Sequence, residues 1–327
     1  MNWPMLLRIA AALLPLLAAG CAHAPVSRLS AEEREMVLAM GQGIDASTPP
    51  DGIRSEVGAV LDLIVPGPSG GIPCRLYRPA NPANPANAAN PTSPAGPAET
   101  AARGTVLLVH GGAWVAGSVD FHDNMARLIC STSQANVLSV EYSRTPDALY
   151  PTQLREIRAV LRWLNRKGQG AGLAPRPLAL CGDSAGGNLC AVLARESAAG
   201  SIALAVLINP VVDLTLAHVS DPEVRGFSEL MLKAYVPAGI DFAEPDLSPL
   251  LSPVPKSHPP TFLAIGDSDP WRAEQDLYAE KLAAAGVPLQ VFRAPTGHLG
   301  PDGAAATPLA LPTLTNAAQA IRTAFAR

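Results

Sequence analysis

The sequence is poor in aromatic residues, in cysteine and in unbalanced charge. Aromatic residues make up 5% of its 327 positions, five positions are cysteine, and the formal net charge is −4. No block of basic residues marks a nucleic-acid-binding face, so we expect no nucleic-acid partner. No repeat of about 20–50 residues is visible, which excludes a solenoid or a propeller. The length suits one α/β domain with a large core.

The chain also lacks an apolar run long enough to remain in a bilayer. Ile9–Ala19 is apolar except for Pro15, but it is too short for a permanent membrane span. With Arg8 before it, this run predicts an export signal over residues 1–20. Leu17-Ala-Ala-Gly-Cys21 resembles a bacterial lipoprotein cleavage site, which would make Cys21 the lipidated first residue of the mature chain.

Ordinary signal cleavage after Ala22-His23-Ala24 is the alternative, although Pro25 would then directly follow the cut. The two alternatives predict different locations. Lipidation of Cys21 predicts a bacterial protein tethered to a membrane and facing the periplasm. Ordinary cleavage predicts a periplasmic or secreted protein.

The remaining cysteines have neither the CxxC nor the Cys/His spacing of a zinc site, so we predict no metal. Export would allow one or two disulfide bridges among Cys74, Cys130, Cys181 and Cys190. Cys181 belongs to the apolar run before Ser184, and Cys190 to the helical run after it. Both are more typical of small buried residues than of bridge partners.

Short apolar runs alternate with amphipathic runs along most of the chain, and this predicts a mostly parallel sheet with helices on both faces. The expected strands are Ala59–Val65, Ile72–Tyr77, Gly104–His110, Asn136–Val140, Leu178–Cys181, Ile202–Ile208, Thr261–Ile265 and Pro288–Phe292. The expected helices are Leu29–Met40, with Ser30 and Glu33 as a capping box, Asp123–Ser131, a run after Pro151, the run after Ser184, Arg272–Ala285 and the C-terminal run.

Three segments fit this alternation poorly. Residues 81–102 are built from repeated Asn-Pro-Ala units, and we expect them to form a surface loop inserted in a single domain over residues 21–327. Residues from about 25 to 55 and from 215 to 252 are candidates for a cap over the functional site.

Gly182-Asp-Ser184-Ala-Gly186 stands between an expected strand and an expected helix. This is the context of a nucleophile elbow, in which a sharp turn exposes a serine hydroxyl. The same letter pattern occurs at Gly67-Pro-Ser69-Gly-Gly71, but there two prolines crowd the serine and no helical pattern follows. That second match predicts a hairpin or a loop. Ser184 is therefore the candidate nucleophile.

A serine needs a base to take its proton, and the base needs an acid to orient it. Of six histidines, His298 alone follows a strand end and also keeps the chain order serine, acid, histidine. His110 ends a strand but precedes the serine, and His122 follows no strand end. Asp267 and Asp269 both follow the strand Thr261–Ile265, and their spacing leaves both open as the acid.

The oxyanion of an acyl-transfer reaction needs N–H donors that are already in place. His110-Gly-Gly-Ala-Trp114 directly follows an expected strand and offers glycine backbone to a substrate. Together with the amide of Ala185, Gly111 and Gly112 are the candidate oxyanion donors.

Several motifs occur here in the order found in one family. They are His110-Gly-Gly-Ala-Trp114, Glu141-Tyr-Ser-Arg-Thr-Pro-Asp147, Gly182-Asp-Ser-Ala-Gly-Gly187, Ser248-Pro-Leu250, Gly266-Asp-Ser-Asp-Pro270 and His298. In this order, from about Ile72 to His298, the chain resembles the hormone-sensitive-lipase-like esterases, bacterial lipolytic family IV. Ala113 replaces a frequent third glycine of that family.

The resemblance implies an α/β-hydrolase fold with a helical cap, and a serine carboxylic ester hydrolase that acts on small-molecule esters through an acyl-enzyme without a cofactor. It also implies that Asp269, in the family's Asp-Pro motif, is the acid. Two alternatives stay open: a non-catalytic ligand-binding protein on the same fold, and an amidase or peptidase with the same triad.

Overall fold

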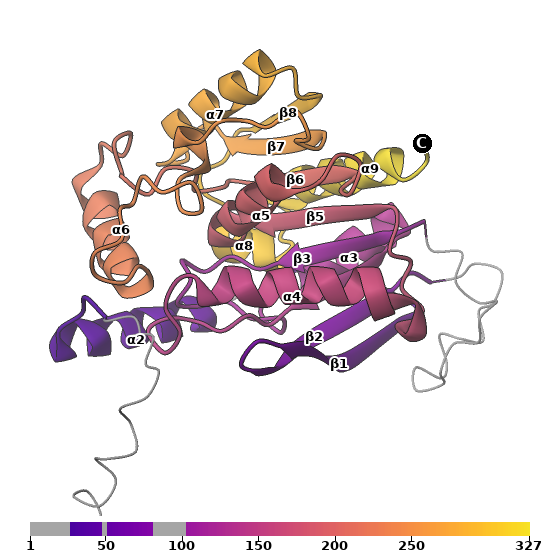
Figure 1. Cartoon of the computed structure of the whole chain (residues 1–327), viewed down its shortest axis with the longest axis horizontal. Coiled ribbons are helices and arrows are strands. Elements are labelled where there is room, and N and C mark those ends of the chain that lie inside the picture. The colour runs from indigo at the N-terminus through magenta and orange to yellow at the C-terminus, as the bar shows by residue number, and fades with distance from the viewer. Residues whose placement is uncertain (1–26, 48–50, 81–102) are drawn as a thin grey trace, which may run out of the picture.

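The computed structural model describes residues 27–47, 51–80 and 103–327 (Figure 1). The predicted export signal over residues 1–20, the predicted lipidation site Cys21 and the predicted loop over residues 81–102 lie outside the described residues. So do residues 25–26 and 48–50 of the first predicted cap segment.

One eight-stranded sheet runs through the molecule in the order β1-β2-β4-β3-β5-β6-β7-β8. Its strands are β1 (Ala59–Gly67), β2 (Gly70–Arg78), β3 (Thr105–Val109), β4 (Asn136–Val140), β5 (Leu178–Asp183), β6 (Leu204–Ile208), β7 (Thr261–Gly266) and β8 (Leu289–Ala294). β1 and β2 are antiparallel, and β3 to β8 pair in parallel. The mostly parallel sheet is thus confirmed, and the second Gly-x-Ser-x-Gly match lies in the β1–β2 hairpin.

Helices cover both faces of this sheet, as its sequence pattern requires. Every residue of β3 to β7 is buried, so each of these strands is apolar on both sides. The helices are α2 (Ala31–Ala46), α3 (Asp123–Ser133), α4 (Thr152–Lys167), α5 (Ser184–Glu196), α6 (Pro222–Tyr235), α7 (Arg272–Ala284), α8 (Gly300–Ala305) and α9 (Leu311–Ala324), with 3-10 turns η3 (Gly168–Ala171) and η4 (Pro249–Leu251).

Alternate strand residues separate into two apolar cores. Leu107, Leu180 and Leu207 face α4, α5 and α7 on one side. Val106 and Val206 face α3 and α9 on the other. In Figure 1, α4 and α5 lie in front of the strands and α9 lies behind them. Each fully buried leucine or valine side chain contributes about 1.5–3 kcal/mol relative to exposure.

Two helices from the segments that fit the alternation poorly lie side by side near the carboxyl ends of the strands (Figure 1). α2 begins at the predicted capping box of Ser30 and Glu33, which is confirmed, and continues to Ala46. α6 begins at Asp221, whose side chain accepts from two backbone N–H groups of the first turn. Val37 of α2 packs with Met231 of α6, and Glu33 pairs with Lys233 at 2.5 Å.

The four cysteines after Cys21 are buried and have free thiols. Cys181 and Cys190 are therefore small core residues, as predicted, and the alternative of disulfide pairing is not realised. Within the described ranges, no helix combines the length and apolar character needed to cross a membrane.

Candidate active site

The turn between β5 and α5 brings the Ser184 hydroxyl to the carboxyl end of the sheet. Ser184 has φ +51°, a left-handed conformation that costs a residue with a side chain about 1–2 kcal/mol. The turn can be this tight because Gly186 packs directly on the neighbouring strand: a Cβ there would lie 2.1 Å from the Val109 carbonyl oxygen. Surrounding glycines thus permit a backbone that exposes the serine at the start of a helix.

The structure brings Ser184, His298 and Asp269 into one hydrogen-bonded chain. His298 follows β8, and its Nε2 lies 2.9 Å from Ser184 Oγ. Its Nδ1 lies 3.1 Å from Oδ2 of Asp269, which follows β7. Because a carboxylate accepts, Nδ1 carries the proton of the neutral ring, and the Nε2 lone pair faces the serine hydroxyl.

Asp269 accepts hydrogen bonds from other donors in addition to His298. Its Oδ2 accepts from Asn209 Nδ2 at 2.7 Å and from Gln275 Nε2 at 3.1 Å, and its Oδ1 accepts from the Trp271 N–H at 3.0 Å. Burial alone would raise the pKa of Asp269, but His298, the Trp271 amide and Gln275 together hold that pKa below its ordinary value. The carboxylate is therefore ionised at neutral pH.

Asp267, the other candidate acid, is exposed to solvent, and its carbonyl oxygen accepts from Arg272. Asn209 and Gln275, which hold Asp269, belong to no motif recognised in the sequence. A signal for Asn209 was present, because this residue directly follows β6 at the carboxyl end of the sheet.

The backbone after β3 forms a tight turn next to Ser184. Gly112, Ala113 and Trp114 have φ of +119°, +51° and +61°, and Gly112 and Ala113 line the same cavity as Ser184 and Ala185. The Gly111 amide donates to Oδ1 of Asp183 at 2.9 Å. Of the three predicted oxyanion donors, the structure therefore brings Gly112 and Ala185 to the cavity of the serine, while Gly111 is already hydrogen bonded within the protein.

A cavity of about 170 Å³ opens beside Ser184 and has a largely apolar wall. Residues from the two side-by-side helices contribute to this wall, together with loops that follow the strands. They include Ile44, Phe121, Val211, Leu216, Phe227, Met231, Leu232 and Trp271. A dry cavity of similar size, about 150 Å³, holds a benzene molecule in another protein. Across the described ranges, no group of three His, Cys, Asp or Glu side chains is arranged to hold a metal ion.

Two further histidines lie close to Gly111: His110 directly precedes it, and His122 contacts the Asp183 carboxylate that accepts from its amide. His110 stacks on Tyr142 with ring centroids 4.1 Å apart, and the Tyr142 hydroxyl donates to the His110 carbonyl at 2.8 Å. Complete burial, with a smaller contribution from His122, lowers the pKa of His110 to about 3, so this ring is neutral. His122 contacts Asp183 and lines the cavity, although no strand end precedes it in the sequence.

A parallel sheet with a serine at a strand–helix elbow, followed by an acid and a histidine after later strands, defines the class of α/β-hydrolases. A family model described as "alpha/beta hydrolase fold" matches residues 106–298. The chain belongs to this superfamily, in its hormone-sensitive-lipase-like branch, family IV.

Several named proteins are similar to this chain over most of its length. It is 32% identical over 244 residues to the carboxylic ester hydrolase LipN of Mycobacterium tuberculosis, covering 69% of this chain and 60% of LipN. It is 31% identical over 258 residues to the esterase LipI of the same organism, covering 75% of this chain and 76% of LipI. A solved esterase of the archaeon Pyrobaculum calidifontis matches with a TM-score of 0.70 and 26% identity, over 89% of this chain and 92% of that one. The chain thus spans less than two thirds of the length of LipN.

Proposed function

We propose that this protein is a serine carboxylic ester hydrolase that works through an acyl-enzyme. The observation that carries the proposal is the 2.9 Å contact between Ser184 Oγ and His298 Nε2, at the edge of an apolar cavity. The names of LipN, an ester hydrolase, and LipI, an esterase, support the same activity.

In the proposed reaction, His298 takes the proton of Ser184 as the hydroxyl attacks the ester carbonyl carbon. Asp269 holds the ring in the tautomer that can accept this proton and stabilises the imidazolium that forms. His298 then protonates the departing alcohol. It next takes a proton from water, which attacks the acyl carbonyl and releases the acid and Ser184.

We assign the oxyanion contacts to the amides of Ala185 and Gly112, joined by that of Ala113. These three residues line the cavity of the serine. The Gly111 amide, predicted as a donor, has an acceptor of its own in Asp183. Its proposed part is to fix the loop, which leaves the following amides free for the substrate.

The size of the cavity supports a short acyl or a small aryl group as the part of the ester bound beside Ser184. Ile44 of α2 and Phe227 and Met231 of α6 line the cavity, so we propose that these two helices serve as the predicted cap. A panel of p-nitrophenyl esters from acetate to decanoate tests this assignment. Turnover should be highest for the short esters, and a maximum at decanoate would contradict the size argument.

Replacement of the nucleophile tests the activity itself. Ser184→Ala should lose at least about 10⁵-fold of the hydrolysis rate of p-nitrophenyl acetate and keep its far-ultraviolet circular dichroism spectrum. Wild-type turnover in Ser184→Ala would overturn the proposal. An inert wild type that still binds esters would favour the non-catalytic alternative. A preference for p-nitroanilides over the matching esters would favour an amidase.

We also propose that the chain is exported and tethered through lipidated Cys21, on the sequence pattern described above. After expression in a bacterium, the wild type should sediment with membranes, and Cys21→Ala should move to the soluble fraction. A Cys21→Ala protein that stays with the membranes would overturn lipidation at this residue.

A further inference from the structure

A second histidine–aspartate contact, between His122 and Asp183, lies next to the serine. Asp183 directly precedes Ser184, and its side chain is 7% exposed. His122 Nε2 lies 3.2 Å from Asp183 Oδ1 and 3.3 Å from Oδ2. Among the described residues, His122 is the one cationic partner within ion-pair distance of this carboxylate.

Both ring nitrogens of His122 face acceptors. Nε2 faces the Asp183 carboxylate, and Nδ1 lies 3.3 Å from the carbonyl oxygen of Ser118. A neutral imidazole has one N–H, so it would direct a lone pair at one of these two oxygens. Only the doubly protonated ring donates to both. The side chain is 2% exposed, so water does not replace either acceptor.

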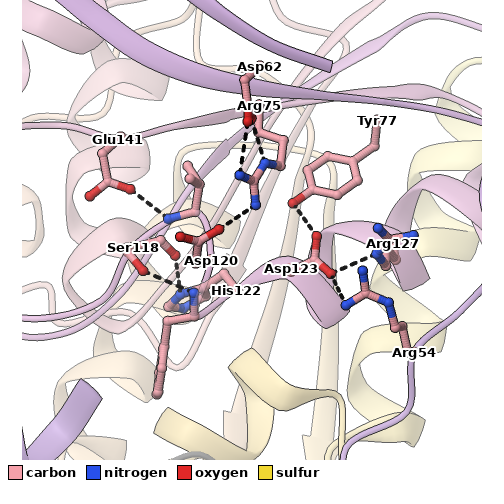
Figure 2. Close-up of polar contacts among 12 residues, drawn as sticks. Arg54, Asp62, Arg75, Tyr77, Ser118, Asp120, His122, Asp123, Arg127 and Glu141 are labelled. Carbon is pink, nitrogen blue, oxygen red and sulfur yellow. Dashed lines mark hydrogen bonds and ion pairs between the residues drawn. The ribbon is translucent and has the colours of Figure 1, made fainter. Parts of the chain in front are cut away.

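The chain segment that carries His122 is fixed on several sides, as Figure 2 shows. Its backbone and its carboxylates bond to neighbouring elements, so the ring has little freedom to leave Asp183. The contacts are Val119 N–H to Glu141 Oε2 (2.7 Å), Asp120 to Arg75 (2.5 Å), and Asp123 to the Tyr77 hydroxyl (2.9 Å), to Arg54 (2.7 Å) and to Arg127 (2.7 Å).

Asp183 connects this histidine to the oxyanion loop. Its Oδ1 accepts from the Gly111 N–H, and its Oδ2 lies 2.2 Å from where a Cβ of residue 111 would stand. An uncompensated carboxylate at this position would oppose the negative charge that develops on the substrate oxygen, and low-dielectric surroundings strengthen such repulsion. The pair with His122 removes that net charge.

We propose that His122 and Asp183 form a buried imidazolium–carboxylate pair that positions the Gly111 amide and keeps the surroundings of the oxyanion hole neutral. Neither residue touches the reacting atoms, so both are positioning residues. The proposal rests on the proposed ester hydrolysis, because turnover is its readout. The other groups near the pair are the His110 ring, 5.6 Å from that of His122, Tyr142 stacked on His110, and Phe121.

The test compares His122→Gln, Asp183→Asn and the double variant by kcat and KM for p-nitrophenyl acetate. His122→Gln leaves the Asp183 charge unpaired, so kcat should fall by about 10–100-fold while KM changes by less than about threefold. Asp183→Asn keeps an oxygen for the Gly111 amide and presents an N–H₂ group to a neutral His122. Its kcat should fall by less than about tenfold.

The double variant separates charge from structure. With both charges gone, it should recover activity relative to His122→Gln and approach Asp183→Asn, a coupling that independent structural losses do not give. The matched control is His218→Gln, which alters a more exposed histidine 3.8 Å from Asp213 and outside the cavity. Its kcat should equal that of the wild type.

Wild-type kcat in folded His122→Gln, or additive losses in the double variant, would each overturn the proposal. An inert wild type would instead overturn the proposed function.

Discussion

The two histidine–aspartate pairs near Ser184 contain the same chemical groups but face different neighbours. His298 has a carboxylate at Nδ1 and the serine hydroxyl at Nε2. His122 has a carboxylate at Nε2 and a backbone carbonyl at Nδ1. The first ring therefore has a lone pair available for a proton, and the second has none. The neighbour of the ring nitrogen that does not contact the carboxylate therefore decides the role of the histidine. A hydroxyl at that nitrogen allows the histidine to act as a base, whereas a carbonyl holds it in a fixed ion pair.

The two aspartates differ in a parallel way. Asp269 accepts from Asn209, Gln275 and the Trp271 amide in addition to His298, so its charge is well solvated by the protein. Asp183 accepts from the Gly111 amide and His122. The acid of the first pair should tolerate the neutral form of its histidine, whereas Asp183 depends on its histidine for charge balance.

Removal of the proposed base should give the largest effect. His298→Gln cannot take a proton from Ser184, so we expect kcat for p-nitrophenyl acetate to fall by about 10⁴–10⁶-fold. This loss should exceed that of His122→Gln by at least about 100-fold. Equal losses in the two variants, measured side by side on folded protein, would remove the distinction between the pairs.

Replacement of Asp269, the acid of the first pair, should give the next largest loss of activity. Asp269→Asn presents an amide N–H₂ or a weaker acceptor to His298 Nδ1, so we expect a loss of about 10³–10⁴-fold in kcat. The matched control is Asp267→Asn, two positions away, exposed and on the same loop, which should change kcat by less than about threefold. A larger loss in Asp267→Asn would exchange the two assignments.

A methyl group at position 111 tests the connection between the second pair and the oxyanion loop. In Gly111→Ala the new Cβ would meet Asp183 Oδ2 at 2.2 Å, so the loop or the carboxylate must move, and we expect kcat to fall by about 10²–10³-fold. Gly43→Ala in α2 is the control, because its new Cβ meets nothing within 4 Å. It should keep its activity and gain about 0.5–1 kcal/mol of stability.

The smallest effect on activity should come from replacing Glu274, a buried carboxyl group of α7. Glu274 is fully buried and accepts from the Val212 N–H at 2.7 Å. Burial raises its pKa from 4.5 to about 8. Because the folded-state pKa is the higher one, Glu274 carries no ionisation penalty below about pH 4.5, and it destabilises the fold progressively as pH rises to about 8.

Glu274→Gln removes this titration. Urea unfolding from about pH 5 to 9 should show wild-type stability falling by a few kcal/mol relative to Glu274→Gln, since each pKa unit is worth about 1.4 kcal/mol. Turnover at pH 7 should stay within about threefold. Parallel stability curves for the two proteins would contradict the raised pKa.

Much of the sheet could be predicted because its strands carry their own signals. β3 to β7 are buried on both faces, and this produces the continuous apolar runs seen in the sequence. The proposed nucleophile, base and acid follow such strands directly, so the parallel arrangement alone brings them to one edge. α6 was missed within residues 215–252, although Asp221 and Pro222 form a recognisable helix start.

The second pair could not be predicted in the same way. His122 follows no strand, and it reaches Asp183 because Arg75, Tyr77 and Glu141, from other elements, fix its segment. The direction of the Gly111 amide likewise depends on a carboxylate 72 positions away in the sequence. Contacts of this kind arise from packing between distant segments, and no local pattern encodes them.

Ser184 should become acylated during turnover, and rapid mixing of the protein with p-nitrophenyl acetate detects this acylation. We expect a burst of p-nitrophenol that approaches one equivalent when deacylation is the slower step. We also expect an added acetyl mass on the peptide containing Ser184 after acid quenching, and neither signal in Ser184→Ala. Steady hydrolysis by the wild type with the acetyl group on another residue, or an undiminished burst in Ser184→Ala, would contradict it.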